Sequence, residues 1–195
     1  MTLKDTCIGF AMTGSFCTFA RVFPQARRLR EEGARVLPIF SFHTAALDTR
    51  FFPAEAVWAR MREACGEEPL ATLQQVEPIG PKRLLDLLII APCTGNTLAK
   101  LAAGIADTPV TLAAKSHLRN ERPVLLAVST NDGLAAAARN IGELLARRHY
   151  FFVPFSQDDP EGKPRSLVAH MEEIPACAAC ALAGVQRQPL LPGTP

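Results

Sequence analysis

The sequence predicts an α/β fold in which a parallel sheet carries helices on both faces, a doubly wound arrangement. Short runs rich in Val, Ile, Leu and Phe alternate with longer segments whose apolar residues recur at helical spacing. This alternation is typical of parallel sheets, whose strands are buried on both faces. With 195 residues and 48% hydrophobic content, the chain is long enough for one substantial core. We therefore expect one Rossmann-like domain over 1–184 and an extended, proline-containing C-terminal arm over 185–195.

Strands are expected where an apolar run ends in a polar turn. Four such runs are Thr6–Met12, Ala34–Phe40, Leu85–Ala91 and Pro123–Ser129. A shorter apolar run covers 150–155, and the ambiguous segment 69–81 contains a candidate edge strand near 72–76.

Helices are expected between these runs. The helical patterns cover 16–32, 53–64, 97–104, 109–118, 133–148 and 167–182. The polar stretch 156–166, with DDPEGKPR at its centre, is a loop of a length that is usually functional or flexible.

Polar side chains follow all four main strands. Parallel strands would bring these turns to one carboxyl edge, where open α/β sheets bind ligands. Hydroxyls, amides and free N–H groups at a helix N-terminus suit a phosphate or another anionic, planar ligand. The candidate binding residues are Gly14, Ser15, Ser41, Thr44, Pro92, Thr94, Gly95, Asn96, Thr97, Ser129, Thr130 and Asn131.

Several of these positions also have ordinary structural explanations. Asn131 and Asp132 could cap the following helix, and Cys93 could be a small buried residue as readily as a nucleophile. The turn Thr13-Gly14-Ser15 lacks the G-x-G-x-x-G pattern, and no acidic residue closes the second strand, which disfavours a Rossmann NAD site. None of the four histidines has the spacing of a catalytic pair, so the catalytic residues stay unassigned.

Composition excludes several classes of function. The net charge is +2, and the small cluster Arg27, Arg28 and Arg30 fits the solvated face of a helix, so nucleic acid is not an expected partner. No apolar run reaches the roughly 18 residues of a membrane span, and no leader pattern is evident, so a cytoplasmic protein is expected. The six cysteines are expected to be reduced, and Cys177 and Cys180 to serve packing; no metal site is expected.

Six motifs resemble a known family. They are TGSFCTF at 13–19, VFPQ at 22–25, EPIGPK at 77–82, APCTGNTLAKLAAGIADTPVTLAAKSHLRNERPV at 91–124, STNDGL at 129–134 and YFFVPFSQDDPEGKPRSLVAHM at 150–171. Together they resemble the B subunits of dipicolinate synthase. That family is related in turn to the flavin-dependent cysteine decarboxylases and flavin prenyltransferases, and the resemblance spans nearly the whole chain.

The resemblance implies an activity and a set of partners. With an A subunit that brings NAD(P), such a protein would take part in the oxidation of dihydrodipicolinate to dipicolinate during sporulation. It implies an FMN-type pocket near a subunit interface, in a homo-oligomer that is a trimer or larger. The phosphate would lie at Thr94–Thr97 and the Gly14-Ser15 turn, and the flavin ring at Ser41 and 129–131.

The dicarboxylate substrate would also need cations. Lys100, Lys115 and Arg119 are the candidates for that role, although Lys100 and Lys115 also fit the solvated side of a helix.

Two departures limit the comparison with the decarboxylases. Pro92-Cys93-Thr94-Gly95-Asn96-Thr97 replaces their Pro-Ala-Ser-Ala-Asn-Thr, and 129–132 replaces their Pro-x-Met-Asn. Their catalytic His and cysteine-bearing clamp are not recognisable, so cysteine decarboxylation is not expected. Two alternatives stay open, a stand-alone flavin enzyme of the decarboxylase or prenyltransferase type and a non-catalytic scaffold for the A subunit.

Overall fold

The computed structural model describes residues 3–193 and is built around a seven-stranded sheet. Its four main strands are β1 (Cys7–Met12), β2 (Arg35–Phe40), β3 (Leu87–Cys93) and β4 (Val124–Thr130). They lie side by side in the order β2-β1-β3-β4, and every pair is parallel. The α/β fold class and the four main strands are thereby confirmed, each to within a few residues of the expected bounds.

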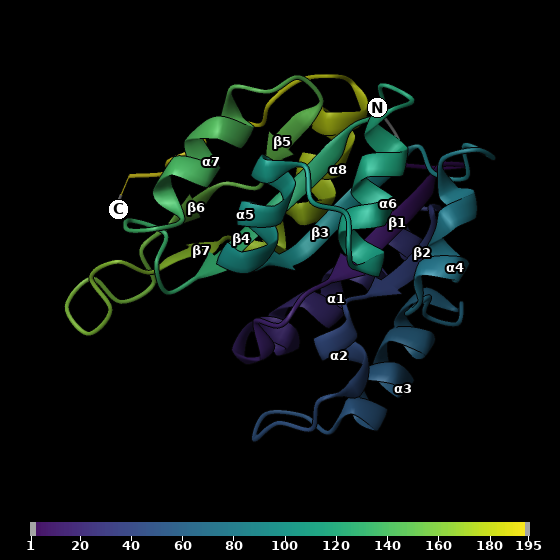
Figure 1. Ribbon diagram of the computed structural model, residues 1–195, viewed down its shortest axis with the longest axis horizontal. Helices are drawn as coiled ribbons and strands as arrows, with labels where there is room; N and C mark the ends of the chain where they lie inside the picture. The colour runs from purple at the N-terminus through teal and green to yellow at the C-terminus, as the bar shows by residue number, and fades with distance from the viewer. Residues whose placement is uncertain (1–2, 194–195) are drawn as a thin grey trace.

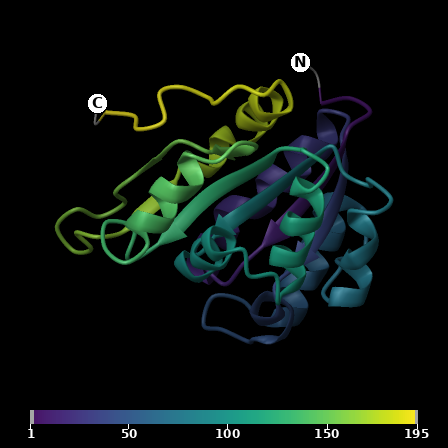
Figure 2. The same ribbon diagram turned by 45° about the horizontal axis from the view of Figure 1, so that its top comes forward.

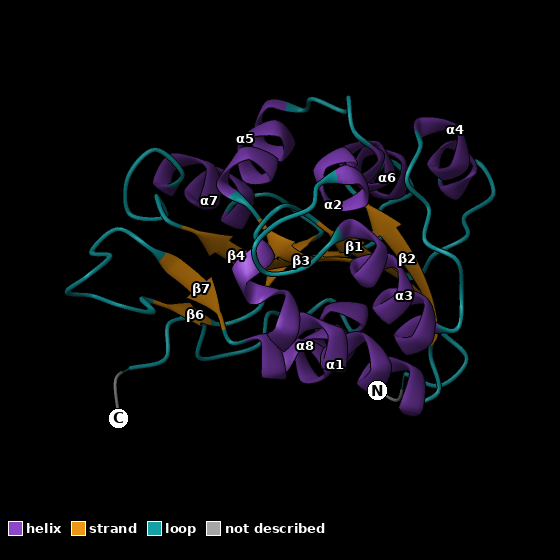
Figure 3. Cartoon of the chain, turned by 90° about the horizontal axis from the view of Figure 1, so that it is seen from below, coloured by secondary structure: helices purple, strands orange, loops and turns teal. Residues whose placement is uncertain are grey.

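Helices cover both faces of the sheet. Figure 3 shows α5, α6 and α7 on one face and α1 and α8 on the other, which is the doubly wound arrangement, and Figure 1 shows the same elements face-on. The helices are α1 (Phe19–Glu31), α2 (Phe42–Ala46), α3 (Ala54–Cys65), α4 (Leu73–Val76), α5 (Gly95–Ala103), α6 (Pro109–Leu118), α7 (Ala138–Leu145) and α8 (Ile174–Leu182). Three short 3-10 turns are η1 (Phe16–Thr18), η2 (Glu77–Ile79) and η3 (Met171–Glu173).

The C-terminal part of the sheet differs from the expected all-parallel pattern. The first half of β4 pairs in parallel with β5 (Tyr150–Phe152), and its last two residues pair antiparallel with β7 (Leu167–Ala169). β6 (Phe155–Ser156) in turn pairs antiparallel with β7. The predicted helix over 167–182 was therefore wrong in its first part, because Leu167–Ala169 supplies strand partners to β4 and β6.

Two further element predictions are corrected. The candidate edge strand near 72–76 is the helix α4, whose start is fixed by a capping box between Thr72 and Gln75. The helix predicted over 133–148 extends only over Ala138–Leu145. A turn precedes it because the Asp132 carbonyl accepts hydrogen bonds from the N–H groups of Ala135 and Ala137.

The C-terminal segment runs along the outer strands, as the yellow trace in Figure 2 shows. The Gln186 side chain receives the N–H of Phe152 and donates to its carbonyl, each at 2.8 Å. The Leu190 carbonyl accepts from the N–H of Phe155 at 3.2 Å. Within 3–193 no helix has the length and apolar character to cross a membrane.

Candidate functional site

The four polar turns meet because the strands that precede them are parallel neighbours. Thr13, which follows β1, lies at the centre of the contacts between them. Its hydroxyl donates to the Pro92 carbonyl at 2.7 Å and accepts the N–H of Thr94 at 3.1 Å. A single buried hydroxyl thus joins the ends of β1 and β3, as the expected shared edge requires.

The N-terminus of α5 points its free N–H groups into this region. Thr94 is the N-cap, and its hydroxyl accepts the N–H of Thr97 at 3.3 Å and lies 3.0 Å from the Thr97 hydroxyl. The N–H groups of Gly95 and Asn96 have no acceptor among the described residues. Because a helix N-terminus carries partial positive charge, these groups can bind an anion without a neighbouring cation.

The turns after β2 and β4 complete the edge. The Ser41 hydroxyl caps α2 by accepting the N–H of Thr44, whose own hydroxyl donates to the Met12 carbonyl at 3.1 Å. The Ser15 and Ser129 hydroxyls lie 2.7 Å apart and tie the turn after β1 to the turn after β4. The predicted binding residues after all four strands therefore come together in space, but Thr44 and Pro92 are buried there and expose little surface to a ligand.

Two pockets open onto this edge, and Gly14 and Thr94 line both of them. The smaller has a volume of about 270 Å³ and is also lined by Ser41, Asn96 and Thr97. The larger has a volume of about 660 Å³ and includes Ser15, Gly95, Ser129, Thr130 and Asn131 in its wall. We call the two pockets together the hydroxyl cleft.

Gly95 is required by the close approach of the two loops. A Cβ atom at Gly95 would lie 2.7 Å from the Thr130 hydroxyl and 2.8 Å from a carboxylate oxygen of Asp132. Thr130 in turn donates a very short hydrogen bond to Asp132. Asp132 therefore braces this loop, and it does not cap α7, which begins at Ala138.

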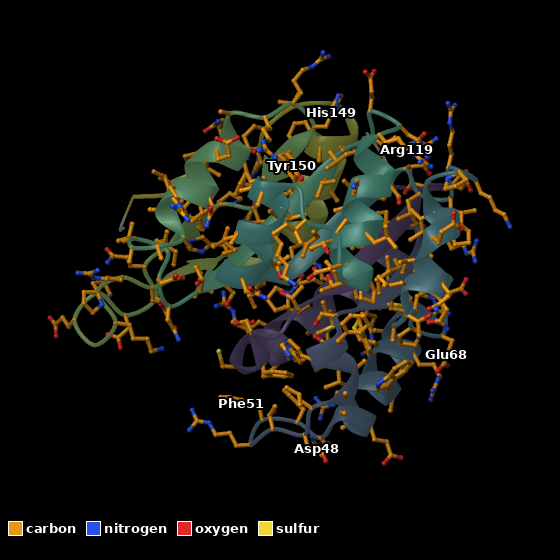
Figure 4. The ribbon with its side chains drawn as sticks, in the orientation of Figure 1. Asp48, Phe51, Glu68, Arg119, His149 and Tyr150 are labelled. Carbon is orange, nitrogen blue, oxygen red and sulfur yellow. The ribbon has the colours of Figure 1, made fainter. Side chains whose placement is uncertain are left out.

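The three cation candidates separate in the structure. Lys100 lines the smaller pocket, where its ammonium group is paired with Asp107 at 2.7 Å. Lys115 lines a different pocket, and Arg119 lies at the C-terminal end of α6. Figure 4 shows Arg119 on the side of the molecule away from Phe51, which borders the larger pocket. Of these three candidates, only Lys100 is therefore placed to contact a ligand of the hydroxyl cleft.

Several lining residues were missed at the level of sequence. Phe16 and Phe51 give the larger pocket two aromatic rings, and the Arg50 guanidinium lies 4.9 Å from the centre of the Phe51 ring. Phe16 belongs to the TGSF turn and could have been found there, but Arg50 and Phe51 come from an irregular segment that carries no sequence signal. Asp158 and Lys163, from the polar loop 156–166, also line this pocket.

Burial disfavours Cys93 as a nucleophile. The thiol is fully buried, and desolvation raises its pKa well above the usual range, so a thiolate is not formed at neutral pH. All six cysteines are free thiols, and Cys177 and Cys180 lie in α8, where Cys177 is buried in the core. The described residues include no group of three His, Cys, Asp or Glu side chains with metal-binding geometry.

The cleft combines hydroxyl and backbone N–H donors, a helix N-terminus, aromatic rings and a few basic side chains such as Lys100 and Arg50. This set of groups fits a phosphate carried by a planar aromatic group better than it fits a metal ion. It contains no pair of strong bases, so its residues can bind and orient a ligand more readily than abstract a proton from it.

Comparison with known proteins supports a flavin-type site. A family model described as Flavoprotein matches residues 1–176. The chain is 43% identical over 190 residues to the dipicolinate synthase B subunit of Bacillus subtilis, covering 97% of this chain and 95% of that protein.

The fold is also similar to those of solved structures. The crystal structure of the dipicolinate synthase B subunit from Bacillus halodurans C is similar with a TM-score of 0.91 and 40% identity, covering all of both chains. The FMN-dependent cysteine decarboxylase SpaF is similar with a TM-score of 0.67 at 19% identity, covering 92% of this chain and 98% of that chain. At that identity the second likeness shows the fold alone.

Proposed function

The chain belongs to the Flavoprotein family and groups with the dipicolinate synthase B subunits, and from this premise we propose that its hydroxyl cleft binds FMN within a dipicolinate synthase. The observation that carries the proposal is the convergence of four strand-end turns on two pockets that share Gly14 and Thr94. A cleft built in this way can hold a phosphate at one end and a planar ring at the other.

The phosphate end is assigned to the smaller pocket. The free N–H group of Asn96, the hydroxyl of Thr97 and the ammonium group of Lys100 are donors in that pocket. Gly95, whose N–H group is also free, lines the larger pocket next to it. The ring end is assigned to the larger pocket, where Ser15, Ser129 and Asn131 offer polar contacts to ring edges and Phe16 and Phe51 offer apolar ones. FMN bound in this way would supply the chemistry of a two-electron carrier, and NAD(P)⁺ of the partner would remain the final acceptor of the hydride.

The proposed reaction is the aromatisation of dihydrodipicolinate. The dihydropyridine ring loses a hydride and a proton to become a pyridine ring, and NAD(P)⁺ carried by an A subunit takes the hydride. This chain's residues would bind the ring, keep water from it and hold its polar edges. The cytoplasmic, sporulation-linked setting and the homo-oligomer, a trimer or larger, are part of the same proposal.

Flavin binding is tested by spectroscopy of the purified chain. We expect FMN to give absorption bands near about 375 and 450 nm that survive dialysis. Riboflavin, which lacks the phosphate, should be lost on dialysis if the smaller pocket holds the phosphate. If neither FMN nor riboflavin is retained, the cleft is not a flavin site, and the remaining interpretation is a protein that binds another anion.

The remaining alternatives are separated by activity assays with the A subunit. The proposed role of the cleft is supported if turnover requires both chains and if the Asn96→Ala or Asn131→Ala substitution lowers the turnover rate. Turnover by this chain alone would instead identify a stand-alone flavin enzyme. Partner-dependent turnover that is indifferent to both variants would identify a scaffold.

A further inference from the structure

A separate pocket lies at the C-terminal ends of α5 and α6, the helices whose N-termini line the hydroxyl cleft. Its volume is about 280 Å³, and no residue lines both it and the cleft. Figure 4 shows His149 and Tyr150 close together near the top of the view, whereas Phe51 lies near the bottom. We call this the basic pocket; its main lining residues are Leu101, Ile105, Lys115, Arg148, His149 and Tyr150.

Not all the cationic side chains of the basic pocket have partners within the protein. Arg147 is fully used, because it donates to the Leu101 and Ala102 carbonyls and pairs with Glu143 at 2.8 Å. The side chains of Lys115 and Arg148, by contrast, make no hydrogen bond or ion pair within 3–193. No Asp or Glu lines the pocket, so its electrostatic potential is positive.

Tyr150 adds a hydrogen-bond donor without a partner. Its side chain is half-buried, yet its hydroxyl has no hydrogen-bond partner among the described residues, although it lies at a pocket wall. Burial raises the pKa of Tyr150 to about 12, so the hydroxyl keeps its proton at neutral pH. Because Tyr150 lines the pocket and its hydroxyl donates to no acceptor within the described residues, the hydroxyl is available to donate to a ligand there.

His149 is held at the pocket by its backbone. Its φ is 68°, in the left-handed region that few non-glycine residues adopt, and its carbonyl accepts the N–H of Val124 at 2.7 Å. The hydrogen bond to the start of β4 therefore fixes a strained residue beside Tyr150.

Part of the lining is apolar. Leu101 lies in the last turn of α5, and Ile105, which is 48% exposed, follows two residues after the helix ends. The pocket thus offers aliphatic surface as well as cations and a hydroxyl. A ligand that uses both kinds of group carries an anionic group on an apolar body of small-molecule size.

We propose that the basic pocket binds a small organic carboxylate, which faces the Lys115 ammonium and the Tyr150 hydroxyl and packs its apolar body against Leu101 and Ile105. The C-terminal ends of α5 and α7 flank the pocket, and their carbonyls carry partial negative charge. This favours a singly charged carboxylate over a doubly charged phosphate. The site is independent of the flavin proposed for the hydroxyl cleft.

The chain offers a direct probe because Tyr150 is its only tyrosine and Trp58 its only tryptophan. In protein labelled with ring-¹³C tyrosine, a single NMR signal reports on the basic pocket. Trp58, whose indole N–H donates to the Ala45 carbonyl at 2.9 Å, serves as the reporter of a region outside it. Benzoate should shift the Tyr150 signal in a saturable way and leave the Trp58 indole signal in place.

Two matched compounds and two matched variants complete the test. Neutral benzamide should not shift the Tyr150 signal, and phenyl phosphate should bind more weakly than benzoate. Lys115→Gln should weaken benzoate at least fivefold, whereas Lys82→Gln, a change at an exposed turn, should leave its affinity unchanged. An unshifted Tyr150 signal, equal binding of benzamide, tighter binding of phenyl phosphate or an unaffected Lys115→Gln protein would each overturn the proposal.

Discussion

The hydroxyl cleft and the basic pocket lie at opposite ends of the same two helices and differ in the groups that would attract an anion. Thr94 and Thr108, the N-caps of α5 and α6, line the cleft, whereas Gly104, the C-cap of α5, and Lys115, near the end of α6, line the basic pocket. Helix N-termini attract anions without help from charged side chains. At the C-terminal ends cations are needed, first to offset the carbonyls, as Arg147 does, and then to bind an anion.

The largest expected difference between the two pockets is produced by a change at Gly95. A Gly95→Val side chain would collide with Thr130 and Asp132 across the cleft, and overpacking of this kind costs about 1–3 kcal/mol. We expect at least a tenfold loss of FMN affinity with benzoate binding at the basic pocket intact. Spectroscopic FMN titration and the Tyr150 NMR signal measure the two effects.

Gly142→Ala is the matched control. Gly142 lies within α7, and nothing lies within 4 Å of the position its Cβ atom would take. Alanine there should raise the free energy of unfolding by up to about 1 kcal/mol without changing FMN affinity. If both glycine variants lost FMN equally, the close approach at Gly95 would not be the cause.

Acid should destabilise the whole fold, and therefore both pockets, through protonation of His117. This side chain lies in α6 and donates its Nε2 hydrogen to the Pro123 carbonyl at 2.9 Å, and burial lowers its pKa to about 4. In the unfolded chain the pKa is about 6.5, so the unfolded state binds a proton more readily between these values. The free energy of unfolding should therefore fall as pH drops from about 6.5 to 4, by an amount on the order of 3 kcal/mol.

Urea denaturation at pH 7 and pH 4.5 measures this loss. His117→Gln keeps an amide donor for Pro123 but cannot be protonated, so its stability should depend less on pH. An equal pH dependence in the variant would assign the acid sensitivity to other groups.

Substitutions at Thr94, the N-cap of α5, test how far FMN binding in the cleft depends on hydrogen bonds made by its hydroxyl groups. Thr94→Ala removes the N-cap of α5 and should cost about 0.5–2 kcal/mol of stability. FMN affinity should fall as well, because the free N–H groups of Gly95 and Asn96 lose their fixed orientation. Thr94→Ser keeps the hydroxyl and should restore both properties, as urea denaturation and FMN titration would show.

The smallest expected effect concerns Lys100, whose charge is already paired with Asp107. Lys100→Gln should weaken FMN only a few-fold, and Asp107→Asn, which frees the ammonium group, should tighten it by a similar factor. Riboflavin titration is the control, since neither variant should alter its binding if the effect acts through the phosphate. If riboflavin affinity changed by the same factors, the effect would not act through the phosphate, and the assignment of the phosphate to the smaller pocket would be wrong.

Local sequence patterns predicted the first four strands and their edge because each strand is long, apolar and closed by a polar turn. Those signals are contained within a few residues of each other, as in Leu87–Cys93 followed by Thr94 and Thr97. The apolar run 150–155 covers β5 and the first residue of β6, but its division into two strands and the strand β7, which lies where a helix was predicted, were missed; these strands have three, two and three residues. Elements so short carry too few residues for a period to be recognised.

The sequence by itself predicted the α/β fold and the hydroxyl residues that line the cleft, because strand periodicity and turn chemistry are local properties; the family followed from the resemblance of six long motifs. Only the tertiary structure decided that Lys115 and Arg119 lie away from Lys100, that Phe51 borders the cleft and that Tyr150 shares a pocket with Lys115. Those placements depend on where α5 and α6 end on the sheet and on how an irregular segment folds back. Packing between distant elements fixes such positions, and no spacing along the chain encodes them.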